Sequence, residues 1–264
     1  MYIRTREETI DLKPDIFYKY DMENMAYFDI ETTGFDKEKD CIMLISLGWF
    51  SEKSTFCVKQ YFAENLQEER DILMQFKKDI EGFNTWCSYN GKAFDEPFIK
   101  IKLTKHNINC IMPDNHVDLY RMIRPYYKKL GIERCNLKTV EKFIGIQRKD
   151  LIDGGISIDL YYKYLQERGE ELKETIMLHN FEDVLNLPKL FEIVSKIDED
   201  DLRRDDIITE KQYKYLQYLI KKSNIEIPCD VEKISKKSAG KVIDCLLRGN
   251  IDIEELMTII KNSY

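Results

Sequence analysis

Two acidic residues, Asp29 and Glu31, stand inside an apolar segment that has the pattern of a central β-strand. Residues 25–31 read MAYFDIE, and the turn sequence TTG follows at once. Because side chains alternate along a strand, both carboxylates belong to one face. Neighbouring buried carboxylates are costly unless a cation neutralises them. The segment therefore predicts a strand that ends at a site for a hard divalent ion such as Mg²⁺ or Mn²⁺.

An exposed strand at the edge of a sheet, with both acids in water, would carry the same Asp-x-Glu pattern. The residues around the acids are apolar, however, and a turn follows directly; these residues are Met25, Ala26, Tyr27, Phe28 and Ile30. They favour the buried interpretation.

The length of the chain, 264 residues, suits one large domain or one domain with a small appendage. The chain is 43% hydrophobic, enough for a core, and 34% charged, as in soluble proteins. No apolar run approaches the ~18–20 residues that are needed to span a membrane. The first residues lack the apolar core of a signal peptide. We therefore expect a cytoplasmic protein that does not contact membranes.

Cysteine usage and net charge narrow the function classes further. The seven cysteines are an odd number and none form a C-x-x-C pair, which argues against a zinc ribbon or a disulfide framework. The net charge of −7 excludes a globally basic nucleic-acid binder. A local acidic cluster for metal ions beside a local basic patch for phosphates remains compatible with this charge.

Residues 25–197 read as strands that alternate with helices and are then followed by helices alone. Expected strands are 25–31, 41–50, 55–62, 85–89 and 116–119, and expected helices are 65–82, 95–105, 119–130, 136–144, 158–167 and 170–194. Pro188 should break the last helix. The order predicts an α/β domain with a mixed five-stranded sheet flanked by helices.

The C-terminal part of the chain reads as a separate unit. Residues 198–206 are dense in charge and predict a linker, so that a first domain would cover residues 1–197. Residues 207–264 predict a small helical module, with Thr209 and Ser235 as N-caps. Its role is open among binding nucleic acid, binding protein and packing against the first domain.

A further acid, Asp95, follows a predicted strand and begins a predicted helix, in the sequence N-G-K-A-F-D. Ligand sites of open α/β sheets form outside the carboxyl ends of strands, which is where this residue would lie. Asp95 is equally well placed to be the N-cap of the helix. The two roles are compatible, because a residue at a helix start can also face the sheet.

His179 and Asp183 stand four residues apart on a predicted helix and therefore share a face. The same stripe of this helix is otherwise apolar. A polar pair on an inward face needs partners. A buried His–Asp hydrogen bond would satisfy it, and so would a catalytic or metal site.

Taken together, these motifs resemble the DEDD 3′–5′ exonucleases of the ribonuclease H-like superfamily. The similarity is to a bacterial predicted-exonuclease branch with the motifs DIETTG, YNGxxFD and HNxxDVL. Here they stand at Asp29–Gly34, Tyr89–Asp95 and His179–Leu185. The resemblance covers residues 22–197, with the three motifs in order and on the expected elements.

The resemblance implies a two-metal phosphodiester hydrolase. Asp29, Glu31, Asp95 and Asp183 would hold two Mg²⁺ or Mn²⁺ ions, and His179 would be the general base. Exonucleases of this group with a base histidine usually space it as H-x4-D, whereas this chain has H-x3-D, which is the spacing of those with tyrosine. The metal role of Asp183 is therefore better supported than the base role of His179.

The expected substrate is nucleic acid, DNA or RNA, with a single-stranded or frayed 3′ end. Thr32, Asn90 and Phe94 would line the site, although Phe94 equally suits the core. Arg121 and Arg124 would meet phosphates, and a solvated helix face explains these charges as well.

Two other functions fit the same residues. One is a ribonuclease H-like endonuclease, against which the N-x-x-x-F-D motif and the histidine before the last acid argue. The other is an inactive ribonuclease H-like fold that binds nucleic acid or protein. Such a protein would be expected to have lost a metal ligand, and none of the four is missing here.

Overall fold

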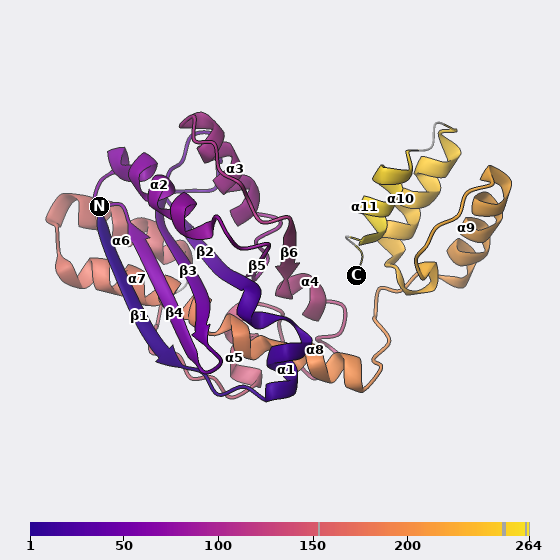
Figure 1. Cartoon of the computed structure of the whole chain (residues 1–264), viewed down its shortest axis with the longest axis horizontal. Coiled ribbons are helices and arrows are strands. Elements are labelled where there is room, and N and C mark those ends of the chain that lie inside the picture. The colour runs from indigo at the N-terminus through magenta and orange to yellow at the C-terminus, as the bar shows by residue number, and fades with distance from the viewer. Residues whose placement is uncertain (153, 250–251, 262, 264) are drawn as a thin grey trace. The chain divides into compact units, whose positions relative to one another are not determined.

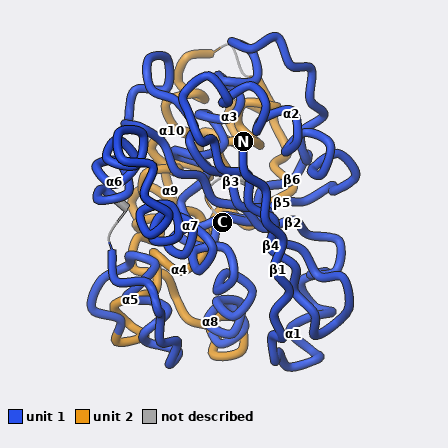
Figure 2. The backbone as a smooth tube through the Cα atoms, turned by 90° about the vertical axis from the view of Figure 1, so that its left-hand side faces the viewer, with its two compact units in different colours: residues 1–120, 132–196 blue, residues 121–131, 197–264 orange. Residues whose placement is uncertain are grey.

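The computed structural model describes residues 1–152, 154–249, 252–261 and 263. The chain forms two compact units, which Figure 2 distinguishes by colour. The first contains residues 1–120 and 132–196, and the second contains residues 121–131 and 197–264. The domain boundaries expected from the sequence, 1–197, 198–206 and 207–264, stay a prediction.

A six-stranded mixed sheet forms the centre of the first unit, in the order β1-β4-β3-β2-β5-β6 (Figure 1). The strands are β1 (Tyr2–Thr9), β2 (Met25–Thr32), β3 (Ile42–Glu52), β4 (Thr55–Phe62), β5 (Thr85–Ser88) and β6 (Asn115–Asp118). Strands β1 to β4 pair antiparallel, whereas β2 with β5 and β5 with β6 pair parallel. The expected α/β fold with a mixed sheet is confirmed, and β2 lies inside the sheet.

The prediction of five strands was one strand short. Strand β1, YIRTREET, pairs antiparallel with β4 along its whole length and forms an edge of the sheet. Its charged side chains suit an edge strand, because such residues discourage pairing with other chains. They also conceal the strand in the sequence, since the segment lacks an apolar stripe.

Helices cover both faces of the sheet in the first unit. On one face α2 and α3 pack against β2, β3 and β5 through residues such as Phe76 and Phe98. On the other face α6 and α7 pack against β3 and β4 through residues such as Tyr161 and Ile176. The helices from the N-terminus to residue 199 are α1 (Pro14–Lys19), α2 (Glu69–Ile80), α3 (Asp95–Lys105), α4 (Leu119–Ile123), α5 (Leu137–Phe143), α6 (Gly154–Glu167), α7 (Glu170–Leu185) and α8 (Leu187–Glu199). Most of α4 and the last residues of α8 belong to the second unit.

Two predicted helices differ from the structure. The helix expected over 119–130 ends at Ile123, before Pro125, and turns follow it. The helix expected over 170–194 is divided into α7 and α8 at Asn186. Because Pro188 has no N–H to donate, this break falls where the sequence predicts it.

The second unit contains the helices α9 (Glu210–Ser223), α10 (Lys236–Leu247) and α11 (Ile253–Lys261), with a core that includes Leu216, Val242 and Leu256. Thr209 and Ser235 are the N-caps of α9 and α10, as expected. Among the described residues no helix is long and apolar enough to cross a membrane.

Candidate active site

Asp29 and Glu31 lie near the carboxyl end of β2, on one face of the sheet. Asp29 is half-buried and Glu31 is buried. The pairing of β2 with β3 shifts between Glu31 and Thr32, so the regular strand ends just after the second acid. Thr32 donates its hydroxyl to the carbonyl oxygen of Gly34 at 2.7 Å and thereby closes the turn. The buried interpretation of the Asp-x-Glu pair is therefore the correct one.

Asp95 lies against β2 rather than capping its own helix. The N-cap of α3 is Phe94, and Asp95 Oδ1 accepts the backbone N–H of Ile30 at 3.1 Å. Strand β5 pairs with β2 only from Met25 to Tyr27, so the backbone of Ile30 lies beyond the parallel ladder. This hydrogen bond brings Asp95 beside the two acids of β2.

A second network fixes the loop before Asp95. Asn90 has a left-handed backbone with φ of 68°, and its N–H is accepted by Asp118 at 2.8 Å. Ser88 Oγ accepts the N–H of Gly91 and lies 2.7 Å from His116 Nε2. His116 Nδ1 in turn lies 2.6 Å from Glu96 Oε2, so Ser88, His116 and Glu96 form a hydrogen-bonded row that holds this loop.

Helix α7 brings His179 and Asp183 to the same place. His179 Nε2 lies 3.5 Å from Glu31 Oε1 and 3.5 Å from Asp183 Oδ2. His179 and Asp183 share a helix face, as their spacing predicts. The hydrogen-bond partner of His179 is a different residue, however, because Nδ1 lies 2.8 Å from Asp150 Oδ2.

A row of polar side chains across the sheet holds Asp29. Asn180 on α7 donates to Asp29 Oδ2 at 2.6 Å, and its own oxygen accepts the hydroxyl of Ser46 on β3. Gln60 on β4 donates to Ser46 at 3.0 Å and to the carbonyl oxygen of Met177 at 2.9 Å. Each buried polar group thereby has a partner, as buried groups require. The row fixes one oxygen of Asp29 and anchors α7 to the sheet.

Sequence reasoning missed Arg148 and Asp150, in the segment between α5 and α6. The Arg148 side chain, which is 6% exposed, donates to Asp183 Oδ1 at 2.5 Å, to the carbonyl oxygen of His179 at 2.9 Å and to Glu141. Asp150 Oδ2 also lies 2.9 Å from Lys138 Nζ. The only signal in the sequence is the charged triplet Arg-Lys-Asp after Gly145, which is typical of an ordinary loop.

The electrostatics of the site call for a cation. Burial, followed by the charges of Asp95 and Asp183, raises the pKa of Asp29 well above its usual value. Burial and the charge of Asp183 raise the pKa of Glu31 well above its usual value. Burial raises the pKa of Asp95 to about 7. Arg148 pairs with Asp183. Within the described part of the chain, no lysine or arginine forms an ion pair with Asp29, Glu31 or Asp95.

The donor set fits divalent metal ions. Ligand atoms of Glu31, His179 and Asp183 all lie within 4.8 Å of one another. The charges of Asp183 and Glu31 act on Asp29, and the charge of Asp95 acts on Glu31. Carboxylate oxygens are the ligands preferred by Mg²⁺ and Mn²⁺. A bound ion would also offset the burial and the mutual repulsion that raise the carboxyl pKa values. Glu31, His179 and Asp183 are the described residues that come close enough to share one ion, and the metal roles of Asp29 and Asp95 stay a prediction.

The remaining predicted residues divide between the two units. Phe94 packs on the core and also makes an edge contact with Phe35, whose exposed fraction is 77%. Arg121 and Arg124 belong to the second unit, where Arg124 lies 4.9 Å from the ring centre of Tyr127. Their predicted phosphate contacts stay a prediction.

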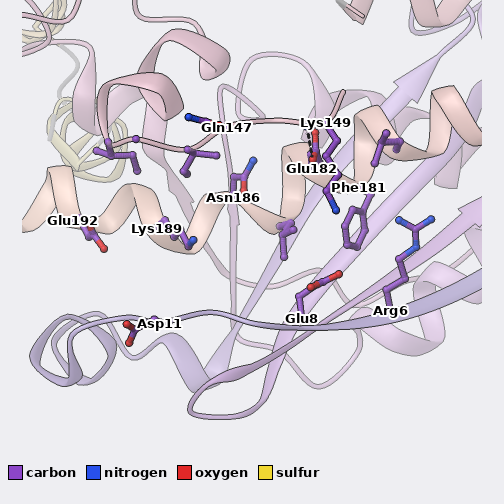
Figure 3. A pocket seen from close by; sticks show the side chains of 15 residues that line it. Arg6, Glu8, Asp11, Gln147, Lys149, Phe181, Glu182, Asn186, Lys189 and Glu192 are labelled. Carbon is purple, nitrogen blue, oxygen red and sulfur yellow. Dashed lines mark hydrogen bonds between the residues drawn. The ribbon is translucent and has the colours of Figure 1, made fainter. Parts of the chain in front are cut away.

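A pocket of about 560 Å³ lies on another side of α7 (Figure 3). It is lined from α7 and α8 by residues such as Phe181, Glu182 and Lys189, and from β1 by Arg6 and Glu8. Figure 3 shows Glu182 bonded to the segment at Lys149. None of the four predicted metal ligands lines this pocket, so we do not place the substrate there.

Residues 26–195 match the RNase H superfamily. This match covers more than half of the chain, which therefore belongs to that superfamily. The ribonuclease H-like resemblance in the motifs is confirmed at this level, and the exonuclease branch stays a prediction.

Other proteins are similar to parts of the chain. Over 182 residues, 67% of the chain, the sequence is 29% identical to the uncharacterized protein YprB of Bacillus subtilis (strain 168). The chain spans 43% of the length of that relative.

Two solved structures are also similar. The family B DNA polymerase of Pyrobaculum calidifontis has a TM-score of 0.49 and 15% identity, over 76% of this chain and 26% of its own. NrnC of Brucella melitensis has a TM-score of 0.41 and 16% identity, over 70% of this chain and 78% of its own. Both likenesses are distant and carry no argument about activity.

Proposed function

We propose that the chain is a metal-dependent nuclease that removes nucleotides from the 3′ end of single-stranded or frayed nucleic acid. The observation that carries this proposal is the convergence of Asp29, Glu31, Asp95 and Asp183 near the carboxyl end of β2. Among the described residues, the first three have no lysine or arginine partner. The 3′–5′ direction rests on the resemblance of the motifs to DEDD exonucleases.

The four acids would hold two Mg²⁺ or Mn²⁺ ions, which supply activation of a water molecule and neutralisation of charge on the phosphate. The protein contributes fixed positions for their ligands. Asn180 holds Oδ2 of Asp29, the N–H of Ile30 holds Oδ1 of Asp95, and Arg148 holds Oδ1 of Asp183. Each aspartate therefore has one oxygen held by the protein, while Oδ2 of Asp183 faces His179 Nε2 at 3.5 Å.

His179 is the residue that would take the proton from the attacking water. Its Nε2 faces Glu31 and Asp183, and its Nδ1 is bonded to Asp150. A histidine with one nitrogen held by a carboxylate and the other directed at the reacting group is arranged as a general base. The water oxygen bonds to phosphorus, the bond from phosphorus to the 3′ oxygen breaks, and the leaving oxygen takes a proton from solvent. A nucleoside 5′-monophosphate is released.

Phe35 and Phe94 would bind the terminal base. Phe35 follows the turn after Glu31, is 77% exposed and contacts Phe94 edge-on at 6.1 Å between ring centres. Exposed aromatic rings bind single-stranded nucleic acid by stacking, which an unpaired end allows. This arrangement favours a frayed or single-stranded end over intact duplex.

The proposal is tested with 5′-labelled single-stranded DNA and RNA, incubated with Mg²⁺, Mn²⁺ or EDTA. Wild-type protein should give a ladder that shortens from the 3′ end and needs a divalent ion. Asp95→Asn should lose the activity, whereas the exposed Asp71→Asn on α2 should keep it. The comparison of DNA with RNA also identifies the preferred sugar.

Circular single-stranded substrates distinguish the proposed exonuclease from an endonuclease, because a circle has no end to degrade. Cleavage of a circle, or internal products from a strand with a blocked 3′ end, would establish an endonuclease instead. Binding without any cleavage by the metal-loaded wild-type protein would establish the inactive binding fold.

A further inference from the structure

A short segment between α5 and α6, residues 148–150, approaches the catalytic face of α7 from outside the sheet. It carries none of the three motifs that point to nuclease chemistry. Two of its side chains nevertheless contact His179 and Asp183 directly. We call residues 148–150 the 148–150 segment.

The contact between Asp150 and His179 is enclosed and specific. Asp150 Oδ2 lies 2.8 Å from His179 Nδ1, and the Asp150 side chain is 1% exposed. Lys138 Nζ at 2.9 Å and Arg148 Nη2 at 3.1 Å approach the same oxygen, and the N–H of Ile152 donates to Oδ1 at 2.9 Å. A carboxylate surrounded by these donors is an acceptor only. His179 Nδ1 must therefore carry the hydrogen, and Nε2 is left as the nitrogen that can exchange a proton.

The direction of the ring follows from this bond. With Nδ1 held by Asp150, Nε2 faces Glu31 and Asp183, at 3.5 Å from each. The ring cannot turn over without losing the buried hydrogen bond. A second group that fixes tautomer and orientation is a common requirement of histidines in active sites and metal sites.

The 148–150 segment is itself held by the helix on which His179 lies. Glu182, one residue before Asp183, accepts the N–H of Lys149 at 3.0 Å and the N–H of Asp150 at 2.9 Å. Arg148 donates to the carbonyl oxygen of His179 at 2.9 Å. Asp150 therefore has a fixed position relative to α7, as a residue that orients another side chain requires.

We propose that Asp150 is a positioning residue that fixes the tautomer of His179 and directs Nε2 toward the four carboxylates. This inference rests on the proposed function for its effect on the reaction rate. Its effect on His179 is independent of activity.

The first test is nuclear magnetic resonance of the imidazole nitrogens in the Mg²⁺-loaded protein. The chain has three histidines, so His179→Gln assigns the signal of interest. Wild-type protein should show His179 with a hydrogen on Nδ1 and a bare Nε2. Asp150→Ala should shift the ring to a mixture of tautomers, and Asp150→Asn, which keeps an acceptor oxygen, should stay nearer to wild type. Finding Nε2–H in the wild type, or an unchanged ring in Asp150→Ala, overturns the proposal.

The second test is kinetic and uses a double-mutant cycle. Asp150→Ala should lower kcat about 10–100-fold with little change in KM, as for other groups that orient a ligand or base. In the background of His179→Ala it should cause no further loss, because the two residues act as one unit. Lys149→Gln is the matched control, since its side chain is exposed and its N–H remains. A further loss in the His179→Ala background would contradict the proposal.

The two tests separate this inference from the proposed function. If the wild-type protein cleaves no nucleic acid, the proposed function fails and the nuclear magnetic resonance test still decides on Asp150. If cleavage is found and the tautomer of His179 is independent of Asp150, the positioning role alone fails. Thermal unfolding of each variant identifies any that has lost its fold.

Discussion

Asp95, at the first position of α3, accepts the backbone N–H of Ile30, the residue that separates Asp29 from Glu31 on β2. One hydrogen bond of 3.1 Å thus joins the motif that ends at Asp95 to the motif that begins at Asp29, across 65 positions of the chain. It explains why a residue at a helix start faces the sheet. It also places Asp95 close enough to other acids for their negative charges to raise its pKa.

Replacing Asp95 should stabilise the metal-free protein while abolishing activity. Folding raises the pKa of Asp95 from 3.8 to about 7, so the folded state binds its proton more tightly than the unfolded state. The free energy of unfolding should therefore fall as the pH rises from about 4 to about 7. Asp95→Asn removes this penalty and should be more stable than wild type at pH 7–8, by about 1–3 kcal/mol. Urea unfolding without divalent ions at pH 4 and pH 7.5 measures the difference, which should shrink at pH 4.

Divalent ions should stabilise the wild-type protein and not the Glu31→Gln/Asp183→Asn double variant. Binding to the folded state alone raises the free energy of unfolding by about 2.7 kcal/mol at one hundred times the dissociation constant. Because the ions displace protons from Asp29 and Glu31, whose pKa values are raised, affinity should increase with pH. Thermal unfolding with Mn²⁺ at pH 6 and pH 8 checks both effects. An equal rise in melting temperature for the double variant would argue against these ligands.

Arg148 should stabilise the folded protein, because it neutralises three carboxylates that it contacts. Its side chain is 6% exposed and contacts Glu141, Asp150 and Asp183. Burial alone lowers the pKa of Arg148, but Asp183 and Glu141 raise it above its usual value, so it stays charged. Arg148→Met leaves Glu141 and Asp183 without this cation, while Asp150 keeps Lys138, and should cost about 3–5 kcal/mol. Mn²⁺ should recover part of this loss, and urea unfolding with and without the ion measures it. A loss no larger than that of Lys149→Met would contradict this role.

Phe35→Ala should weaken substrate binding with little effect on stability. Its side chain is 77% exposed, so its removal creates no cavity. Stacking on one base contributes about 1–3 kcal/mol, which predicts a KM increase of about 10-fold and a smaller change in kcat. Phe35→Trp should restore the affinity. Tyr18→Ala, which removes another exposed aromatic ring, is the matched control and should leave KM unchanged.

The predicted site residues from the three motifs lie where local sequence rules placed them. Asp29 and Glu31 could be assigned to one strand face because the period of a strand is fixed, and His179 and Asp183 to one helix face for the same reason. Ligand-binding residues of α/β sheets usually lie where a strand ends and a helix begins. Asp95 is predicted as a site residue because it stands at such a position.

The partners of these residues could not be predicted in the same way. Asp150 and Arg148 lie in an irregular segment without periodicity, and their role depends on contacts with residues about thirty positions away. Strand β1 was missed because its charged residues hide the strand pattern, and its pairing with β4 is visible only in three dimensions. Tertiary contacts between polar groups leave no regular trace in a single sequence.

The central claim, that four carboxylates form a two-ion metal centre, is tested most directly by counting bound ions. Titration of the metal-free protein with Mn²⁺, followed by electron paramagnetic resonance, gives the number of sites and their affinity. The account predicts two Mn²⁺ ions per wild-type chain and a clear loss of binding in Asp29→Asn, while Asp71→Asn binds as wild type. Wild-type binding no stronger than that of Asp29→Asn would contradict the metal centre and, with it, the proposed chemistry.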